Sequence, residues 1–354
     1  MPHSLDDRAF VTRLDPQDML GRTERFPDQC REALAIARRV SVSAPQQRPG
    51  VALLTGMGGS AAGGDFARCL SEAFSTVPFV VNRDYKLPRY VGIGDYVFCA
   101  SYSGNTEETL GAYADARHAG ANVVAVTSGG KLAELAKKDG YPTFIIPAGH
   151  PPRTALGYML IPVLVAMEAL KLLPEMDFEK CFQLLDECKN EWTVETPYDN
   201  NPTKQLAQEM HGNLAVIYGL GLWQGAIANR WKQQINENAK NMAFANTYPE
   251  LNHNEILGWV GAKGQGVQKW VMATLMDGSE TAKMNTRAAV TERLVSGTAE
   301  AHHVQARGDH LLEKLLSLAF FGDFVSIYLA ALNGVDPENI DWINTLKTEL
   351  SQVP

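Results

Sequence analysis

Short apolar runs alternate with amphipathic segments through the first half of the chain. These runs are rich in β-branched and aromatic residues and occupy residues 51–55, 76–85, 95–101, 121–128 and 141–149. Residues 4–40 and most of the connections between the runs have helical spacing. Strands that alternate with helices of this length predict a parallel, doubly wound α/β sheet. The long apolar stretch at 154–173 predicts a helix that is buried on most of its sides.

The second half of the chain repeats this plan. Residues 213–240 have the pattern of a strand followed by a helix, and residues 269–294 have it again. An apolar helix at 310–336 and a short helix at 340–350 complete the pattern. We therefore predict two α/β lobes, each a mainly parallel sheet flanked by helices. The predicted boundaries are 1–34 for an N-terminal helical segment, 35–188 for the first lobe, 189–204 for a polar linker and 205–354 for the second lobe with its C-terminal helices.

Composition and charge narrow the classes of partner. The 354 residues are 45% hydrophobic and carry a net charge of −8, which disfavours nucleic acid and anionic membranes. No stretch reaches the length of a transmembrane helix, and residues 1–20 lack the apolar segment of a secretory signal. The five cysteines are scattered without zinc spacing, as expected for core thiols in a reducing compartment. We expect a cytoplasmic protein.

Two loops rich in glycine and hydroxyl residues follow predicted strands of the first lobe. One is GMGGSAAGG at 56–64, and the other is SYSGNTEET at 101–109. Ligands bind at the carboxyl ends of strands in sheets of this kind. Glycine lets a ligand approach the backbone, and a helix that starts there offers free N–H groups to an anion. The two loops together predict a small phosphate-binding cup.

Two other interpretations of these loops stay open. The hydroxyls of Ser101, Ser103 and Thr106 could serve only to cap one helix. The glycines at 56–64 also match a dinucleotide fingerprint loosely, but such a match is weak alone and does not explain the hydroxyl cluster. There is no Walker A lysine pattern.

The loops carry a resemblance to a known family. SYSGNTEET resembles the phosphate-binding signature S-x-S-G-x-T-x-E-T of sugar isomerase (SIS) domains, and GMGGSAAGGD resembles the glycine-serine loop that precedes it in that fold. Downstream, PPRTALGY at 151–158 and NENAKNMAFANTYPELNHNEILGW at 236–259 resemble the bifunctional phosphoglucose/phosphomannose isomerases. The resemblance implies an enzyme that interconverts fructose 6-phosphate with glucose 6-phosphate and mannose 6-phosphate through an enediol(ate), without a cofactor.

The chemistry implied by this resemblance assigns roles to four side chains. Glu237 in NENAK would be the base that moves a proton between C1 and C2. His253 in NHNE would exchange a proton with the ring oxygen, and Lys347 would assist ring opening. Arg153 would place a fixed charge near the enediolate. The groups expected to hold the substrate phosphate are Gly58, Gly59, Ser60, Ser101, Ser103 and Thr106.

The same resemblance implies a homodimer in which His253 is donated across the interface. We expect no metal, because the adjacent His302 and His303 would point to opposite faces of a strand and chelate poorly. Three alternatives for the whole protein differ in class. They are a non-catalytic sugar-phosphate sensor, the isomerase part of an aminosugar synthase, which would need a further domain, and a nucleotide-dependent oxidoreductase, which rests only on the glycine match.

Overall fold

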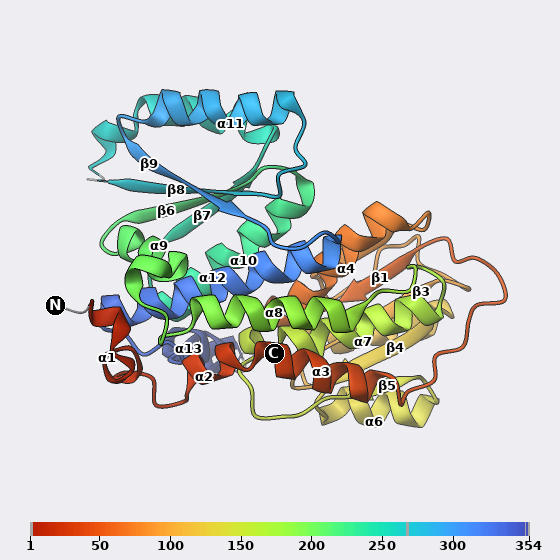
Figure 1. Cartoon of the computed structure of the whole chain (residues 1–354). Coiled ribbons are helices and arrows are strands. Elements are labelled where there is room, and N and C mark those ends of the chain that lie inside the picture. The colour runs from red at the N-terminus through yellow and green to blue at the C-terminus, as the bar shows by residue number, and fades with distance from the viewer. Residues whose placement is uncertain (1–2, 267–268, 351, 353–354) are drawn as a thin grey trace. The chain divides into compact units, whose positions relative to one another are not determined.

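The computed structural model describes residues 3–266, 269–350 and 352. The chain forms two compact units. The first-sheet unit comprises Arg25–Leu185 with His310–Leu312, and the second-sheet unit comprises Met1–Glu24, Asp186–Asp309 and Glu313–Pro354. Each unit has its own sheet with helices against it (Figure 1).

The sheet of the first-sheet unit has five strands in the order β2-β1-β3-β4-β5, all parallel. The strands are β1 (Ala52–Thr55), β2 (Phe79–Asn82), β3 (Tyr96–Ala100), β4 (Asn122–Thr127) and β5 (Thr143–Ile145). Apolar side chains point to both faces of β1 and β3, which are wholly buried, as expected when helices cover both faces of a parallel sheet.

Helices cover the two faces of this sheet. On one face, α5 (Glu107–Ala119) and α6 (Gly130–Asp139) pack against Val97 and Val123. The helices α3 (Phe26–Ala37), α4 (Gly58–Phe74) and α7 (Leu156–Ala169) also belong to this unit. A Cβ at Gly63 of α4 would lie 3.0 Å from the carbonyl oxygen of Met159, so a residue without a side chain lets α4 and α7 pack closely. The predicted parallel α/β fold of this lobe is confirmed.

The sheet of the second-sheet unit has four parallel strands in the order β7-β6-β8-β9. The strands are β6 (Leu214–Gly219), β7 (Ala243–Thr247), β8 (Trp270–Met276) and β9 (Ala299–Gln305). Helix α10 (Leu222–Ala239) packs on the sheet, and α11 (Ala282–Val295) lies along the other face with the short 3₁₀ turns η4 (Glu250–His253), η5 (Glu255–Val260) and η6 (Ala262–Gln265) beside it (Figure 1). This sheet confirms the second predicted α/β lobe.

The remaining elements complete the two units around their sheets. They are η1 (Ser4–Asp6), α1 (Arg8–Thr12), α2 (Met19–Glu24), η2 (Pro152–Thr154), α8 (Phe178–Trp192), η3 (Tyr198–Asn200), α9 (Pro202–Met210), α12 (Leu311–Asn333) and α13 (Asp341–Leu350). Most of the segment predicted as a linker is therefore structured.

The expectation that no stretch reaches membrane-spanning length is wrong for α12. This helix has 23 residues and is apolar enough to cross a bilayer, yet 89% of its most apolar window is buried inside the protein. The indole of Trp231 donates a hydrogen bond to the Leu318 carbonyl (2.7 Å) and stacks on Phe321. We therefore assign α12 as a core helix, because core helices and membrane spans share the same length and composition.

A buried lysine fixes the chain at the end of the predicted linker. Lys204 on α9 is fully buried, and its ammonium donates to Asp6 Oδ1 (2.8 Å) and to the carbonyls of Val194 and Thr196 (2.7 Å each). Burial lowers the pKa of Lys204, and the Asp6 carboxylate offsets part of that effect. All three ammonium donors have an acceptor, so the N-terminal turn is tied to residues almost two hundred positions away.

We predict that Lys204→Met destabilises the protein by about 3–5 kcal/mol, because the variant leaves a carboxylate, a buried carbonyl and a partly buried carbonyl without their donor. Urea unfolding followed by circular dichroism measures this loss. The control is Lys283→Met on the exposed surface of α11, which should change the free energy of unfolding by less than about 0.5 kcal/mol. Equal stability of the two variants would contradict the role given to Lys204.

Candidate active site

The two glycine and hydroxyl loops meet at one edge of the first sheet. Strands β1 and β3 are parallel neighbours, so the loops that follow them emerge side by side. The backbone N–H of Tyr102 donates to Ser60 Oγ (3.1 Å), which joins the loop after β3 to the first turn of α4. This pairing brings together the two segments of the predicted cup, which lie far apart in the sequence.

The hydroxyls of the second loop organise the loop itself. Ser101 is 1% exposed; its Oγ lies 2.8 Å from Thr106 Oγ1 and accepts the N–H of Gly104 (3.1 Å). Ser103 is exposed, and its Oγ accepts the N–H of Asn105 (3.3 Å). Thr106 occupies the N-cap position of α5, but its side chain caps no helical N–H. The capping interpretation therefore does not describe these contacts.

Two glycines let other backbone segments approach the cup. Gly104 has φ +70°, and a Cβ there would run into the carbonyl oxygen of Gly129. A Cβ on Gly59 would lie 2.7 Å from the carbonyl carbon and oxygen of Pro152. Gly59 thus brings the η2 turn, which carries Arg153, directly against the start of α4.

The η2 turn holds Arg153 beside the cup. Arg153 is only 6% exposed, which is uncommon for a guanidinium and requires polar surroundings. Gln29 of α3 fixes the end of the turn, since its side chain donates to the Thr154 carbonyl and accepts the N–H of Gly157 (2.8 Å each). Gln29 was not predicted from the sequence. Its only sequence signal is that it is a polar residue within the amphipathic pattern of α3.

Glu237 lies in the second-sheet unit, on the last turn of α10. It lines a cavity of about 630 Å³ between the end of α10 and the start of α13. The other lining residues are Asn236, Lys240, Asn241, Met242, Asn339, Ile340, Asp341, Trp342 and Ile343. The Lys240 ammonium donates to the main-chain carbonyls of Glu237 (2.8 Å) and Asp336 (2.6 Å). This lysine therefore serves to close the end of the helix.

Helix α13, whose first turn lines this cavity, carries Lys347 one turn further along. Lys347 lies four residues after Ile343, which lines the cavity, so both project from the same face of the helix. The helix is exposed along its length, and Trp342, another lining residue, is 92% exposed. An amphipathic helix with an unburied aromatic residue stands at the mouth of the Glu237 cavity.

His253 is exposed at the end of η4 and lies away from Glu237. The side chain of Asn236, next to Glu237, accepts the N–H of Ala243 at the start of β7 (2.9 Å), whereas His253 follows the end of β7. A strand of five residues spans about 16 Å. Within one chain, these two predicted catalytic residues therefore lie at opposite ends of the strands of the second sheet, Glu237 by the amino ends and His253 by the carboxyl ends.

The predicted site residues thus fall into three groups. The cup residues and Arg153 come together in the first-sheet unit. Glu237 and Lys347 lie on neighbouring helices of the second-sheet unit, and His253 lies at the other edge of its sheet.

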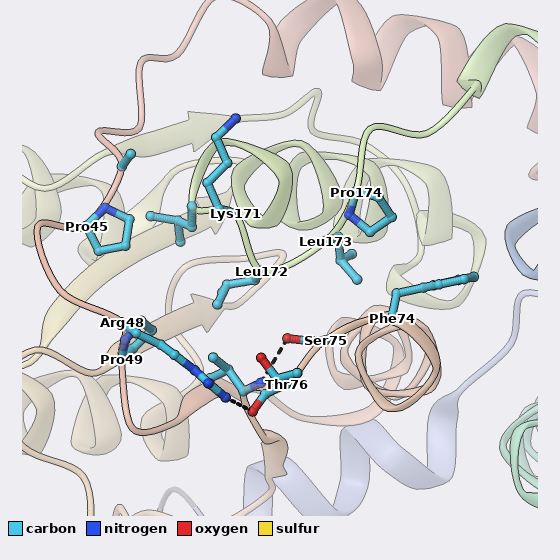
Figure 2. Close-up of a pocket in the computed structure, with 13 residues that line it drawn as sticks. Pro45, Arg48, Pro49, Phe74, Ser75, Thr76, Lys171, Leu172, Leu173 and Pro174 are labelled. Carbon is cyan, nitrogen blue, oxygen red and sulfur yellow. Dashed lines mark hydrogen bonds between the residues drawn. The ribbon is translucent and has the colours of Figure 1, made fainter.

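A second cavity, of about 550 Å³, lies at the opposite edge of the first sheet (Figure 2). It is lined by the residues before β1, the residues before β2 and the chain after α7, including Arg48, Phe74, Lys171 and Leu172. Helices α4 and α7 end here, and the partial negative charge of their C-termini disfavours a phosphate. The Arg48 guanidinium donates to the Thr76 carbonyl. This cavity therefore suits a phosphate less well than the predicted cup does.

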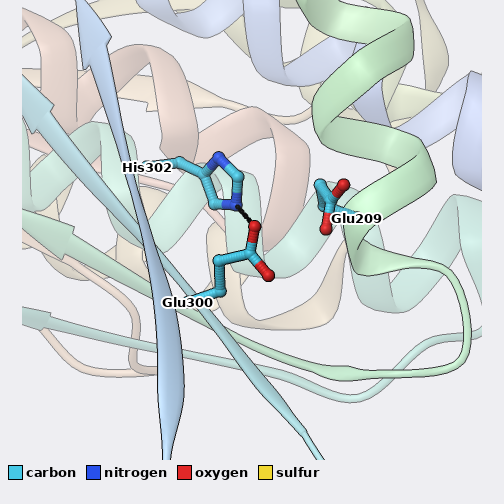
Figure 3. A group of neighbouring side chains, drawn as sticks. All are labelled: Glu209, Glu300 and His302. Atoms are coloured by element: carbon cyan, nitrogen blue, oxygen red, sulfur yellow. Dashed lines mark ion pairs between the residues drawn. The ribbon is translucent and has the colours of Figure 1, made fainter. Parts of the chain in front are cut away.

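One cluster has the composition of a metal site (Figure 3). Candidate ligand atoms of Glu209, Glu300 and His302 lie within 4.8 Å of one another. The Lys269 ammonium, however, lies 3.1 Å from Glu209 Oε2 and 2.6 Å from Glu300 Oε2. Hydrogen bonds to Glu300 and Glu209 raise the pKa of Lys269, so this ammonium stays charged and already pairs with both carboxylates. We therefore assign Lys269, Glu209 and Glu300 as an ion-pair cluster. His303 lies outside this cluster, and its ring contacts Glu292 (2.5 Å).

Comparison with known proteins identifies the class. Residues 199–350 match the family model of the bacterial phospho-glucose isomerase C-terminal SIS domain. The fold is also that of a hypothetical protein from Thermus thermophilus, with a TM-score of 0.70 and 15% identity over 99% of this chain and 94% of that one. Fold and loops together define a protein with two SIS-type lobes.

Relatives of known name narrow the class to a family. The chain is 38% identical over 332 residues to the bifunctional phosphoglucose/phosphomannose isomerase of Caldicellulosiruptor bescii, covering 93% of this chain and 97% of that one. It is 36% identical over 301 residues to the protein of the same name from Thermoplasma volcanium, covering 84% and 91%. The chain belongs to the bifunctional phosphoglucose/phosphomannose isomerase family, which confirms the resemblance seen in its motifs.

We predict that Gly59→Ala weakens fructose 6-phosphate binding about tenfold or more, because the new Cβ forces the η2 turn and Arg153 away from the cup. Isothermal titration calorimetry measures the dissociation constant. The control is Gly92→Ala in the same unit, where a Cβ meets no atom within 4 Å and binding should not change. Unchanged binding by a folded Gly59→Ala variant would contradict the predicted phosphate site.

Proposed function

We propose that this protein is a metal-independent aldose–ketose isomerase that interconverts fructose 6-phosphate with glucose 6-phosphate and mannose 6-phosphate. The observation that carries this proposal is the cup at the carboxyl edge of the first sheet. Ser60 and Ser101 are fixed there by hydrogen bonds, and a buried arginine sits beside them. Backbone N–H groups and hydroxyls suit a phosphate that must be held while the rest of the sugar reacts.

The reaction requires one proton to move between C1 and C2 of the open-chain sugar. Glu237 removes the proton from C2 of the aldose, and the electrons of that C–H bond move to the carbonyl oxygen to give the enediolate. Arg153 stabilises this negative charge while a proton passes from the C2 hydroxyl to the C1 oxygen. Glu237 then returns its proton to C1: the electrons of the C1–C2 double bond form the new C1–H bond, and the C2 oxygen becomes the carbonyl of the ketose. In the reverse direction, reprotonation at C2 from one face or the other, after rotation about the C2–C3 single bond, gives glucose 6-phosphate or mannose 6-phosphate.

The cyclic sugar must open before this transfer. His253 and Lys347 exchange the proton between the anomeric hydroxyl and the ring oxygen. Because β7 separates His253 from Glu237 in one chain, we propose a homodimer in which each site takes its histidine from the partner subunit.

The five cysteines are free and buried, which supports a reducing cytoplasmic setting.

The first test is turnover of fructose 6-phosphate by protein treated with EDTA, with glucose 6-phosphate and mannose 6-phosphate assayed separately. We expect both products from the wild type and a loss of about 10²–10⁴-fold in Glu237→Gln, because an amide cannot accept the proton. Glu134→Gln, a carboxylate on the surface of α6, should keep full activity. Measurable binding of fructose 6-phosphate without formation of either product would instead identify a sugar-phosphate sensor.

The shared site is tested by mixing two strongly impaired variants, Glu237→Gln and His253→Ala, under conditions that exchange subunits. A mixed dimer then holds one site with both residues intact. We expect about a quarter of wild-type activity at equal amounts, since half of the dimers are mixed and one of their two sites works. Failure of mixing to restore activity, with exchange shown by mass spectrometry, would assign both residues to sites within one chain.

A further inference from the structure

The turn that carries His253 has little regular structure of its own. Both η4 and η5 are short 3₁₀ helices, whose hydrogen-bond geometry is weaker than that of an α-helix. Among the residues that the structure describes, no side chain is hydrogen-bonded or ion-paired to the exposed His253 ring. The position of this ring therefore depends on how the residues on each side of it are held.

On one side, residues 251 and 252 hold the turn to the second-sheet unit. Leu251 is fully buried in the core between the sheet and α11. The Asn252 side chain donates to Thr291 Oγ1 of α11 (2.9 Å). These contacts fix the chain up to the residue before His253.

On the other side, Glu255 holds the turn to the sheet. Its carboxylate accepts one hydrogen bond from the Tyr218 hydroxyl of β6 and another from the Asn246 amide of β7 (2.5 Å). The Trp259 indole donates to the same Tyr218 oxygen (3.0 Å) and continues the network into η5. Asn254 caps η5 by accepting the N–H of Glu255 (2.6 Å).

We propose that Glu255 is a positioning residue that sets the place of the His253 imidazole during ring opening. This inference rests on the proposed function. Glu255 does not touch the substrate itself; it acts by fixing the backbone two residues after the histidine. A carboxylate suits this position because both groups that face it are donors.

The chemistry of the network shows why an amide cannot replace Glu255. Tyr218 is fully buried, and burial followed by the hydrogen bond to Glu255 raises the pKa of Tyr218, so its phenol stays protonated and donates. A glutamine at 255 would turn an NH₂ group toward either Tyr218 or Asn246, both of which offer hydrogens. One donor of the network would lose its acceptor, and the turn would lose its fixed position.

A kinetic double-mutant cycle tests this coupling, with His253→Ala, Glu255→Gln and the double variant measured on fructose 6-phosphate. We expect Glu255→Gln to lower kcat/KM about tenfold to a hundredfold in the wild-type background and to have no further effect in the His253→Ala background. The pH dependence of kcat/KM in Glu255→Gln should resemble that of His253→Ala and differ from that of the wild type. Independent, multiplicative losses would overturn the proposal.

Two further variants keep the outcome decisive. Glu300→Gln removes a carboxylate from the ion-pair cluster of the same unit and should keep full activity. Tyr218→Phe removes the donor without altering Glu255 and should show the same dependence on His253, so it replaces Glu255→Gln if that variant does not fold. An active His253→Ala with an impaired Glu255→Gln would overturn the proposal while leaving the isomerase intact. A wild type without isomerase activity would reject the proposed function instead.

Discussion

The parallel pairing of β1 with β3 is the constraint on which the candidate site depends. Because the strands run in the same direction and lie side by side, both following loops emerge at one edge, and Ser60 can accept the Tyr102 N–H. Gly59 and Gly104 then let the η2 turn and the Gly129 backbone approach the same place. The predicted phosphate site needs no cation at its centre, because backbone N–H groups and hydroxyls can hold a phosphate.

The second sheet sets a different constraint through β7. Glu237 precedes this strand and His253 follows it, so a single chain presents them at opposite edges. This separation is the physical argument for a site completed by a second copy. In the proposed dimer the His253 turn also has a structural role, since a histidine offered to another subunit must be held in place by its own subunit.

The sequence pattern predicted both sheets but not every strand. Strands β7 and β9 are mostly exposed or half-buried and lack an apolar run, so periodicity gives no signal for them. Length and composition could not show that α12 is a core helix, because burial decides that question. The loops after β1 and β3 were predicted because their glycine and hydroxyl residues are close together in the sequence and directly follow apolar strands. Gln29 and Lys204 were not selected, because their partners lie far away in the chain. Glu255 stands in the NHNE motif, but its partners on β6 and β7 could not be predicted from the sequence.

The most direct test of the central claim is a crystal structure of Glu237→Gln with fructose 6-phosphate bound. The account predicts that the phosphate lies in the cup, within hydrogen-bond distance of Ser60, Ser101 and the first N–H groups of α4. It also predicts that His253 of a second subunit approaches the sugar. A phosphate bound at the opposite edge of the first sheet, near Arg48 and Lys171, would contradict the account.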